Sequence, residues 1–161
     1  MERAFEMGTP QTNRLLVVDD EEANRDLLSR RLKKAGFDVE MAATAHEALQ
    51  IMAREKIDLI LLDYMMPEMN GIDLLKLLRA TQTQSDLPVI MVTAVSDSVR
   101  VVEALSSGAN DYVTKPIDFP VALARVEAQL IRRDADRILR TSEERLSMAA
   151  SSNQEIGRAH V

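Results

Sequence analysis

The stretch IDLILLDYMMPEMNG, residues 57–71, organises the rest of the chain around itself. Residues 57–62 are almost continuously apolar, a run too short for a helix and of the length of a strand buried on both faces. Asp63 follows where this strand should end. A proline, an asparagine and Gly71 then supply turn chemistry before apolar residues resume at helical spacing. The pattern predicts a buried parallel strand with an aspartate at its carboxyl end.

Further strands are predicted along the chain. Residues 15–18 and 89–92 are short apolar runs like 57–62, residues 37–41 alternate like a less buried strand, and residues 111–114 form a short strand. Helices are predicted at residues 21–35, 44–52, 70–79 and 97–105, and again from Phe119 onward. Strands and helices thus alternate five times, which indicates an α/β fold with a doubly wound, five-stranded parallel sheet. Two strand orders fit, and the flavodoxin-like order 2-1-3-4-5 is favoured because it places strands 1 and 3 side by side.

Apolar spacing also predicts which helix residues face the core. In the first helix these include Leu27 and Leu28, and in the fourth they are Val99, Val102 and Leu105.

Helix starts carry recognisable capping residues. Thr44 precedes the second helix with Glu47 three residues later, the pattern of a capping box. Ser96 or Asp97 is expected to cap the fourth helix.

Composition narrows the classes of function. The net charge of −6 argues against a general nucleic-acid-binding surface, so we expect no direct binding to nucleic acid. No apolar run reaches the length of a membrane span, and the N-terminus lacks the apolar segment of a secretory signal. The absence of cysteine excludes disulfides and thiolate zinc sites. A cytoplasmic protein that does not enter a membrane is the expectation.

Polar side chains follow four of the five strands. Asp19 and Asp20 end the first, Asp63 the third, Thr93 the fourth and Lys115 the fifth. In this fold the four ends face one crevice, where crowded carboxylates raise one another's pKa unless a cation is present. Hard oxygen ligands suit Mg²⁺, the ammonium group suits a phosphoryl oxygen, and the hydroxyl supplies a donor. The set predicts a site for phosphoryl transfer to a carboxylate.

Four motifs in this order resemble one family. They are VVDD at residues 17–20, LLDYMMPEMNG at 61–71, VTA at 92–94 and YVTKP at 112–116. From about Asn13 to Leu130 the chain resembles a response-regulator receiver domain of two-component signalling.

The resemblance implies a phosphorylated residue and a metal site. Asp63 would accept a phosphoryl group from the phosphohistidine of a histidine kinase or phosphotransfer protein. Asp20, Asp63 and the backbone carbonyl of Met65 would bind Mg²⁺, with Asp19 acting through a bound water. The only chemistry expected is self-phosphorylation and self-dephosphorylation, so the chain would be a regulatory domain and not an enzyme.

The resemblance also implies a switch. Lys115, Thr93 and Ala94 would hold the phosphoryl group, and Thr93 would swing toward it while Tyr112 turns inward. These movements would reshape the surface made by the fourth helix, the fifth strand and the fifth helix. The bond between Lys115 and Pro116 is expected to be cis.

Two other classes of protein share parts of this pattern. Hydrolases that form an aspartyl phosphate carry a second aspartate two positions after the nucleophile, where this chain has Met65. A docking pseudo-receiver that works without phosphorylation is the second alternative. The complete acidic set, together with Lys115 and Thr93, argues against it.

The ends of the chain fall outside the predicted domain. Residues 1–13 are expected to form a mobile tail, residues 14–131 the receiver domain, and residues 132–161 a helical linker. In the linker, small and apolar residues repeat at the spacing of a heptad seam: Ala135, Leu139, Ser142, Leu146 and Ala149.

The linker allows two interpretations, a solvated helix or a coiled coil that joins a homodimer of receivers to an output domain. Residues 142–154 faintly resemble the segment that leads into PAS sensor domains. The chain is then either a stand-alone receiver with a long tail or a piece of a longer protein, and we expect the second.

Overall fold

Five parallel strands form one sheet in the computed structural model, which describes residues 12–94 and 98–159. The sheet order is β2-β1-β3-β4-β5, as predicted. The strands are β1 (Arg14–Val18), β2 (Asp38–Ala42), β3 (Leu59–Asp63), β4 (Val89–Ala94) and β5 (Asp111–Lys115). The helices are α1 (Glu22–Lys34), α2 (Ala45–Arg54), α3 (Gly71–Arg79), α4 (Ser98–Ser106) and α5 (Phe119–Ala159). The predicted fold class is therefore confirmed.

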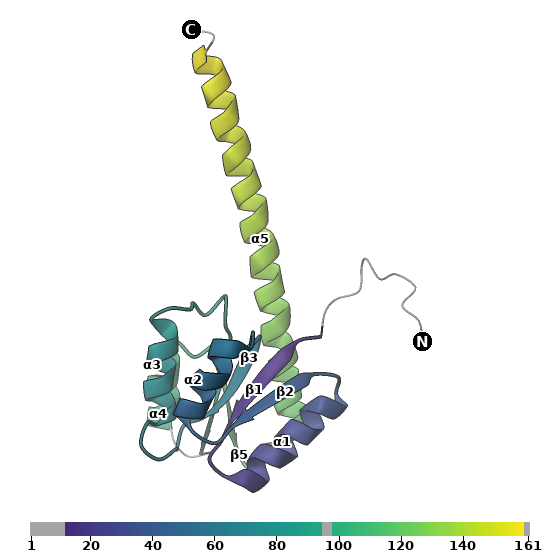
Figure 1. Cartoon of the computed structure of the whole chain (residues 1–161), viewed down its shortest axis with the longest axis vertical. Helices are drawn as coiled ribbons and strands as arrows, with labels where there is room; N and C mark the ends of the chain where they lie inside the picture. Colours follow the sequence, from purple (N-terminus) through teal and green to yellow (C-terminus); the bar gives the residue numbers. More distant parts are fainter. Residues whose placement is uncertain (1–11, 95–97, 160–161) are drawn as a thin grey trace, which may run out of the picture.

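Helices cover both faces of the sheet, and β3 is buried along its whole length (Figure 1). Leu59 and Leu61 pack with residues of α1 and α5. Ile60 and Leu62 pack with residues of α2, α3 and α4 on the opposite face. Successive side chains of a strand point to opposite faces, so a strand covered on both sides must be apolar at every position. That requirement explains the continuous apolar run that marks β3 in the sequence.

The prediction of which α4 residues face the core is wrong. Val99, Val102 and Leu105 are 77%, 63% and 43% exposed, whereas Ala104 on the other side of the helix is buried. In α1, Leu28 is buried as predicted but Leu27 is 52% exposed. Periodicity shows which residues share a helical face, but it does not show which of two apolar faces packs on the sheet.

The capping predicted for α2 is confirmed. Thr44 Oγ1 accepts a hydrogen bond from the Glu47 amide at 3.1 Å, and Glu47 Oε1 accepts one from the Ala43 amide at 2.8 Å. At the start of α3, Asn70 Oδ1 accepts a hydrogen bond from the Asp73 amide, whereas Glu21 before α1 makes no side-chain cap. Ser96 and Asp97, expected to cap α4, lie outside the described residues.

The last helix, α5, runs for 41 residues and extends well beyond the sheet (Figure 1). Leu139 and Leu146, two residues of the predicted heptad seam, are exposed. In the described part of the chain, no helix combines the length and the apolar character that crossing a membrane requires.

A buried arginine attaches α5 to the start of the sheet. Arg133 is 4% exposed, although it stands in a run of charged residues between Arg132 and Asp134. Its Nη1 donates to Asp58 Oδ1 at 2.8 Å, just before β3, and its Nη2 donates to Asn13 Oδ1 at 3.1 Å, just before β1. Asp58 also accepts a hydrogen bond from the Arg14 amide at 2.7 Å. This network ties the long helix to the two central strands.

We predict that Arg133→Ala lowers the free energy of unfolding by about 3 kcal/mol, because removing one partner leaves a largely buried carboxylate at Asp58 without its counter-charge. Chemical denaturation measures the change. Arg132→Ala is the matched control: Arg132 is exposed, and its replacement should cost less than about 0.5 kcal/mol. Equal losses in the two variants would contradict the role of Arg133.

Candidate functional site

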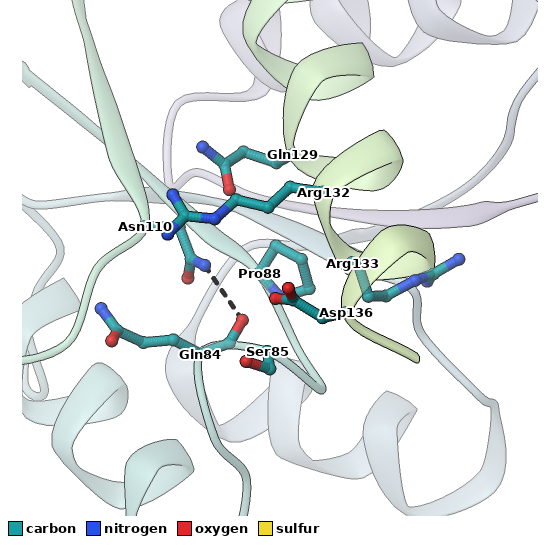
Figure 2. A pocket seen from close by; sticks show the side chains of 8 residues that line it. All are labelled: Gln84, Ser85, Pro88, Asn110, Gln129, Arg132, Arg133 and Asp136. Carbon is teal, nitrogen blue, oxygen red and sulfur yellow. Dashed lines mark hydrogen bonds between the residues drawn. The ribbon is translucent and has the colours of Figure 1, made fainter. Parts of the chain in front are cut away.

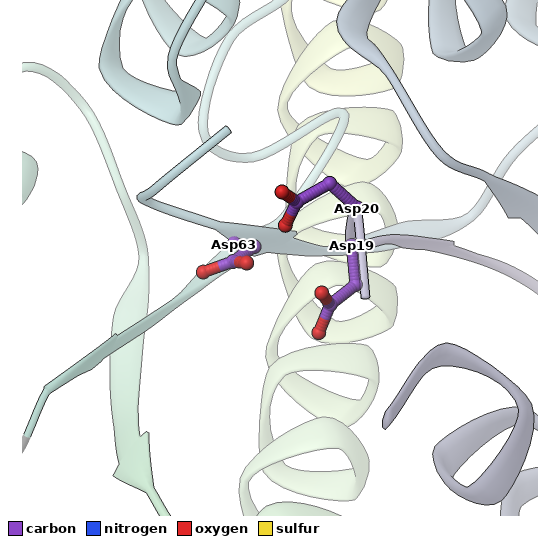
Figure 3. Close-up of side chains that lie close together, drawn as sticks. All are labelled: Asp19, Asp20 and Asp63. Carbon is purple, nitrogen blue, oxygen red and sulfur yellow. The ribbon is translucent and has the colours of Figure 1, made fainter. Parts of the chain in front are cut away.

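Three carboxylates meet at the carboxyl edge of the sheet (Figure 3). Asp19 and Asp20 directly follow β1, and Asp63 is the last residue of β3. Each offers a carboxylate oxygen, and these oxygens lie within 4.8 Å of one another. Asp63 and Asp19 are 2% and 5% exposed, whereas Asp20 is exposed. The adjacency of β1 and β3 brings the three together, as the predicted strand order requires.

The backbone around Asp19 holds its side chain in place. Asp19 Oδ1 accepts a hydrogen bond from the Glu21 amide at 2.8 Å. The Asp19 carbonyl oxygen accepts one from Arg25 Nη1 at 2.8 Å, and its amide donates to the Ala42 carbonyl oxygen at 3.1 Å. Sequence reasoning missed Arg25, which is half-buried on α1.

Lys115, the last residue of β5, reaches across β4 to Asp63. Its Nζ lies 3.1 Å from each of the two carboxylate oxygens. The following bond to Pro116 is cis. On the other side, the Met65 amide donates to Asp63 Oδ1 at 3.3 Å. The binding of a metal by the Met65 carbonyl stays a prediction.

Burial and neighbouring charges shift the pKa values of Asp63 and Lys115. Burial raises the pKa of Asp63 from 3.8 to about 6, and the charge of Asp19 adds to the rise while Lys115 opposes it. Burial on its own would lower the pKa of Lys115, but attraction and a hydrogen bond to Asp63, together with the charge of Asp19, raise it. The site therefore favours a cation, whether a proton or a metal ion, close to Asp63.

Thr93 stands beside this pair with an unused hydroxyl. It is buried near the end of β4, and among the described residues its Oγ1 has no hydrogen-bond partner. The next residue, Ala94, is exposed and lies opposite Lys115 in the pairing of β4 with β5. An unpartnered buried hydroxyl at this position is suited to donate to an anion bound at Asp63.

Tyr112 lies on β5 before Lys115 and opposite Met91 of β4. It is half-buried, and the Arg125 guanidinium carbon lies 5.9 Å from the centre of its ring. Its role as a switch stays a prediction.

A second tyrosine, which sequence reasoning missed, connects the site to α4. Tyr64 follows Asp63 directly, and its hydroxyl donates to Glu103 Oε1 at 2.5 Å. The Arg100 guanidinium carbon lies 4.6 Å from the centre of the Tyr64 ring. Glu103 lies 39 residues from Tyr64 in the chain, and no local pattern indicates such a contact. The residue next to Asp63 is thus in contact with the helix whose apolar face is exposed.

Gly71 is required by close packing against Asp63. A Cβ at this position would lie 2.3 Å from the Asp63 carbonyl oxygen and 3.0 Å from the Tyr64 Cα. The Gly71 amide donates to the Tyr64 carbonyl oxygen at 2.9 Å, which closes the loop between β3 and α3. A side chain here would push on the backbone of the residue that carries the central carboxylate.

The donor atoms at this edge fit a magnesium ion. Mg²⁺ prefers hard oxygen ligands and binds through one or two carboxylates while it keeps several waters. The Asp19, Asp20 and Asp63 carboxylates supply such ligands, and the exposed side of Asp20 leaves room for water.

Comparison with known proteins gives the family. Residues 15–127 match the family model of the response regulator receiver domain. The chain belongs to this family. A receiver domain is a regulatory domain of two-component response regulators, as the motifs and the fold had indicated.

Relatives and solved structures agree with this assignment. The DNA-binding response regulator MtrA of Mycobacterium tuberculosis (strain ATCC 25618 / H37Rv) is 43% identical over 121 residues, which are 75% of this chain and 52% of MtrA. A CheY-like receiver domain from Methanospirillum hungatei JF-1 is similar with a TM-score of 0.72 and 31% identity, over 78% of this chain and 99% of that one. A putative two-component system response regulator/GGDEF domain protein gives a TM-score of 0.73 and 31% identity, over 76% of this chain and 51% of that one. The chain spans about half the length of the curated relatives that it matches.

The comparison overturns one prediction. We expected no direct binding to nucleic acid, but MtrA is named a DNA-binding response regulator, so that prediction was wrong. It rested on the net charge of −6, which describes these 161 residues alone. Relatives about twice as long contain residues whose charge this number does not describe.

The raised pKa of Asp63 leads to a pH prediction for metal-free protein. The folded protein keeps the Asp63 proton up to about pH 6, whereas the unfolded chain releases it near 3.8. Stability from this group is therefore fully present below pH 3.8 and is lost as the pH rises through about 6. Relative to Asp63→Asn, the wild type should lose on the order of 2 to 3 kcal/mol across this window.

Urea denaturation at a series of pH values, with a chelator present, measures this difference. Glu127→Gln, which removes an exposed acid on α5, should keep the pH dependence of the wild type. The pKa assignment fails if Asp63→Asn follows the same curve as the wild type.

We also predict that Gly71→Ala lowers the free energy of unfolding by about 1 to 3 kcal/mol, because the added Cβ overpacks against backbone that cannot move aside. It should also reduce the pH-dependent difference described above, since Asp63 is displaced. In Gly36→Ala the new Cβ meets nothing within 4 Å, and the cost arises only from the φ of 107°. That control should lose stability without a change in pH dependence, and the same outcome for Gly71→Ala would contradict the packing argument.

Proposed function

We propose that this chain is the phosphoacceptor switch of a two-component phosphorelay, and that the side chain phosphorylated is Asp63. The observation that carries the proposal is the placement of Lys115 Nζ 3.1 Å from both oxygens of a buried carboxylate at the end of the central strand. A simple strand end does not need a buried acid that faces an ammonium group and two further acids.

The donor in this proposal is a phosphohistidine on a histidine kinase or phosphotransfer protein. An Asp63 carboxylate oxygen forms the new bond to phosphorus while the bond from phosphorus to the imidazole nitrogen breaks, and the histidine leaves with that electron pair. The attacking group must be the carboxylate and not the acid. Lys115 helps to hold Asp63 ionised, because its charge lowers the pKa of that carboxyl.

The metal in this proposal is Mg²⁺. Asp20, Asp63 and the Met65 backbone carbonyl would hold it, with Asp19 bound through a water. When bound, it neutralises negative charge on the carboxylates and on the transferring phosphoryl oxygens. Lys115, Thr93 and Ala94 would receive the remaining phosphoryl oxygens. The Thr93 hydroxyl, which has no hydrogen-bond partner among the described residues, supports this assignment.

The phosphorylated state would then be read through the elements that touch Asp63. We propose that Thr93 moves toward the phosphoryl group and that Tyr112 turns inward, which changes the surface of α4, β5 and α5. The contact of Tyr64 with Glu103 and Arg100 offers α4 a second connection to the site. A ligand shifts such an equilibrium only by its differential affinity for the two states, so the phosphoryl group must bind one arrangement of Thr93 better than the other.

The long helix α5 would carry the change away from the domain. Because relatives of about twice the length are named DNA-binding, we propose that an attached output domain, of the DNA-binding kind among others, responds to the phosphorylated state. A phosphorylation-independent docking module is the alternative, and the complete set of acids with Lys115 and Thr93 argues against it.

Mass spectrometry tests the proposal directly. Incubation with acetyl phosphate and Mg²⁺ should add one phosphoryl group to the wild type and none to Asp63→Asn, because the nucleophile is absent. Asp73→Asn, which removes an exposed acid in the first turn of α3, should be labelled like the wild type. A chelator should abolish labelling, since the carboxylate charges are then not neutralised. Labelling of Asp63→Asn at the wild-type rate would refute the assignment.

A further inference from the structure

A small polar pocket lies at the edge of the sheet opposite Asp63 (Figure 2). It is formed where the loop between α3 and β4 and the residue before β5 face the last helix. The residues that line it are Gln84, Ser85, Pro88, Asn110, Gln129, Arg132, Arg133 and Asp136. Its volume is about 120 Å³. An engineered cavity of about 150 Å³ holds one benzene, whose six non-hydrogen atoms set the scale, so this pocket has room for about five non-hydrogen atoms.

One buried polar atom in this pocket has no partner. The Gln129 side chain is 8% exposed, and among the described residues its Oε1 accepts no hydrogen bond. Figure 2 shows this oxygen turned toward Arg132 and Asn110. Leaving a buried acceptor unpaired costs about 1 to 3 kcal/mol, so a donor is expected to fill the place when the protein is in use.

Two opposite charges on α5 also face this pocket without partners. Arg132 and Asp136 lie one helical turn apart, and neither makes an ion pair or hydrogen bond with a residue that the structure describes. Arg133 points away from the pocket (Figure 2) and is bound to Asp58 and Asn13. Asn110 Oδ1 accepts hydrogen bonds from Arg79 and Val89, and its Nδ2 donates one to the Gln84 carbonyl oxygen. Within the part of the chain that the structure describes, the groups of the pocket that carry the argument and lack a partner are the Arg132 guanidinium, the Asp136 carboxylate and Gln129 Oε1.

From these groups we infer that the pocket binds a small zwitterion of the size of a simple α-amino acid. The carboxylate of such a molecule matches the two parallel donors of Arg132. Its ammonium group matches the acceptors that lack a donor, Asp136 and Gln129 Oε1. A simple anion would leave the two acceptors unpaired, and a simple cation would leave the guanidinium unpaired.

The pocket lies where a bound ligand would connect the long helix to the rest of the domain. A ligand there contacts α5 on one side and the loop between α3 and β4 on the other, at the point where the helix leaves the domain. Ligand binding in this pocket would be separate from the chemistry at Asp63, because the pocket lies at the amino ends of the strands and the acidic site lies at their carboxyl ends.

Titration followed by nuclear magnetic resonance tests the site on the full chain. Glycine is the probe, because its five non-hydrogen atoms match the pocket volume, and the side-chain amide signals of Gln129 and Asn110 are the reporters. We expect saturable shifts with a dissociation constant of about 1 mM, as for a ligand of this size. Acetate and methylammonium each carry only one of the two charges, and each should bind at least about tenfold more weakly.

Two variants assign the contacts. Arg132→Gln and Asp136→Asn should each weaken glycine binding about ten- to hundredfold, the effect of one charge-assisted hydrogen bond. Both change half-buried or exposed side chains on a helix, so the amide spectrum should show that the fold is kept. Shifts that do not saturate, or acetate binding as tight as that of glycine, would overturn the zwitterion site. So would unchanged glycine affinity in both variants.

Discussion

Repulsion between like charges at one edge of the sheet is the constraint on which the rest of this structure depends. Three carboxylates share a small volume, and two of them are buried. Such a cluster is stable only if a cation is present, and Lys115 is the protein's own cation for Asp63. The parallel sheet holds these groups together. β1 and β3 must be neighbours for the acids to meet, and β5 must extend two residues past the level of Asp63 so that Lys115 can reach back to it.

The sequence allowed the sheet and the acidic site to be predicted because both follow from local patterns. An apolar run marks β1, β3 and β4, a polar residue at the end of each run marks its carboxyl end, and the parallel topology brings those ends together with that of β5. Asp19, Asp63, Thr93 and Lys115 could therefore be placed without knowledge of any contact. The strand order needed one further argument, the adjacency of strands 1 and 3.

What the sequence did not show are contacts between distant segments and the choice between two faces of one helix. Arg133 and Asp58 are 75 residues apart, and nothing near Arg133 distinguishes it from the exposed arginine before it. The hydrogen bond between Tyr64 and Glu103 could not be predicted for the same reason, because the two residues are 39 positions apart. In α4 the apolar spacing was real, but the helix packs through its small residue Ala104 and leaves its larger residues outside. Packing of the whole domain decides such features.

The attachment of α5 to the domain makes the part of that helix beyond it a lever arm. Arg140 still pairs with Asp86 in the loop before β4, so the unattached part begins at about residue 141 and ends at residue 159. At about 1.5 Å per residue this part spans about 28 Å, and a tilt of about 5° at the attachment would move its far end by about 2.5 Å. Displacements at the domain too small to disturb its core are therefore magnified along the helix. The geometry converts a local change of angle into a distance that a neighbouring domain can sense.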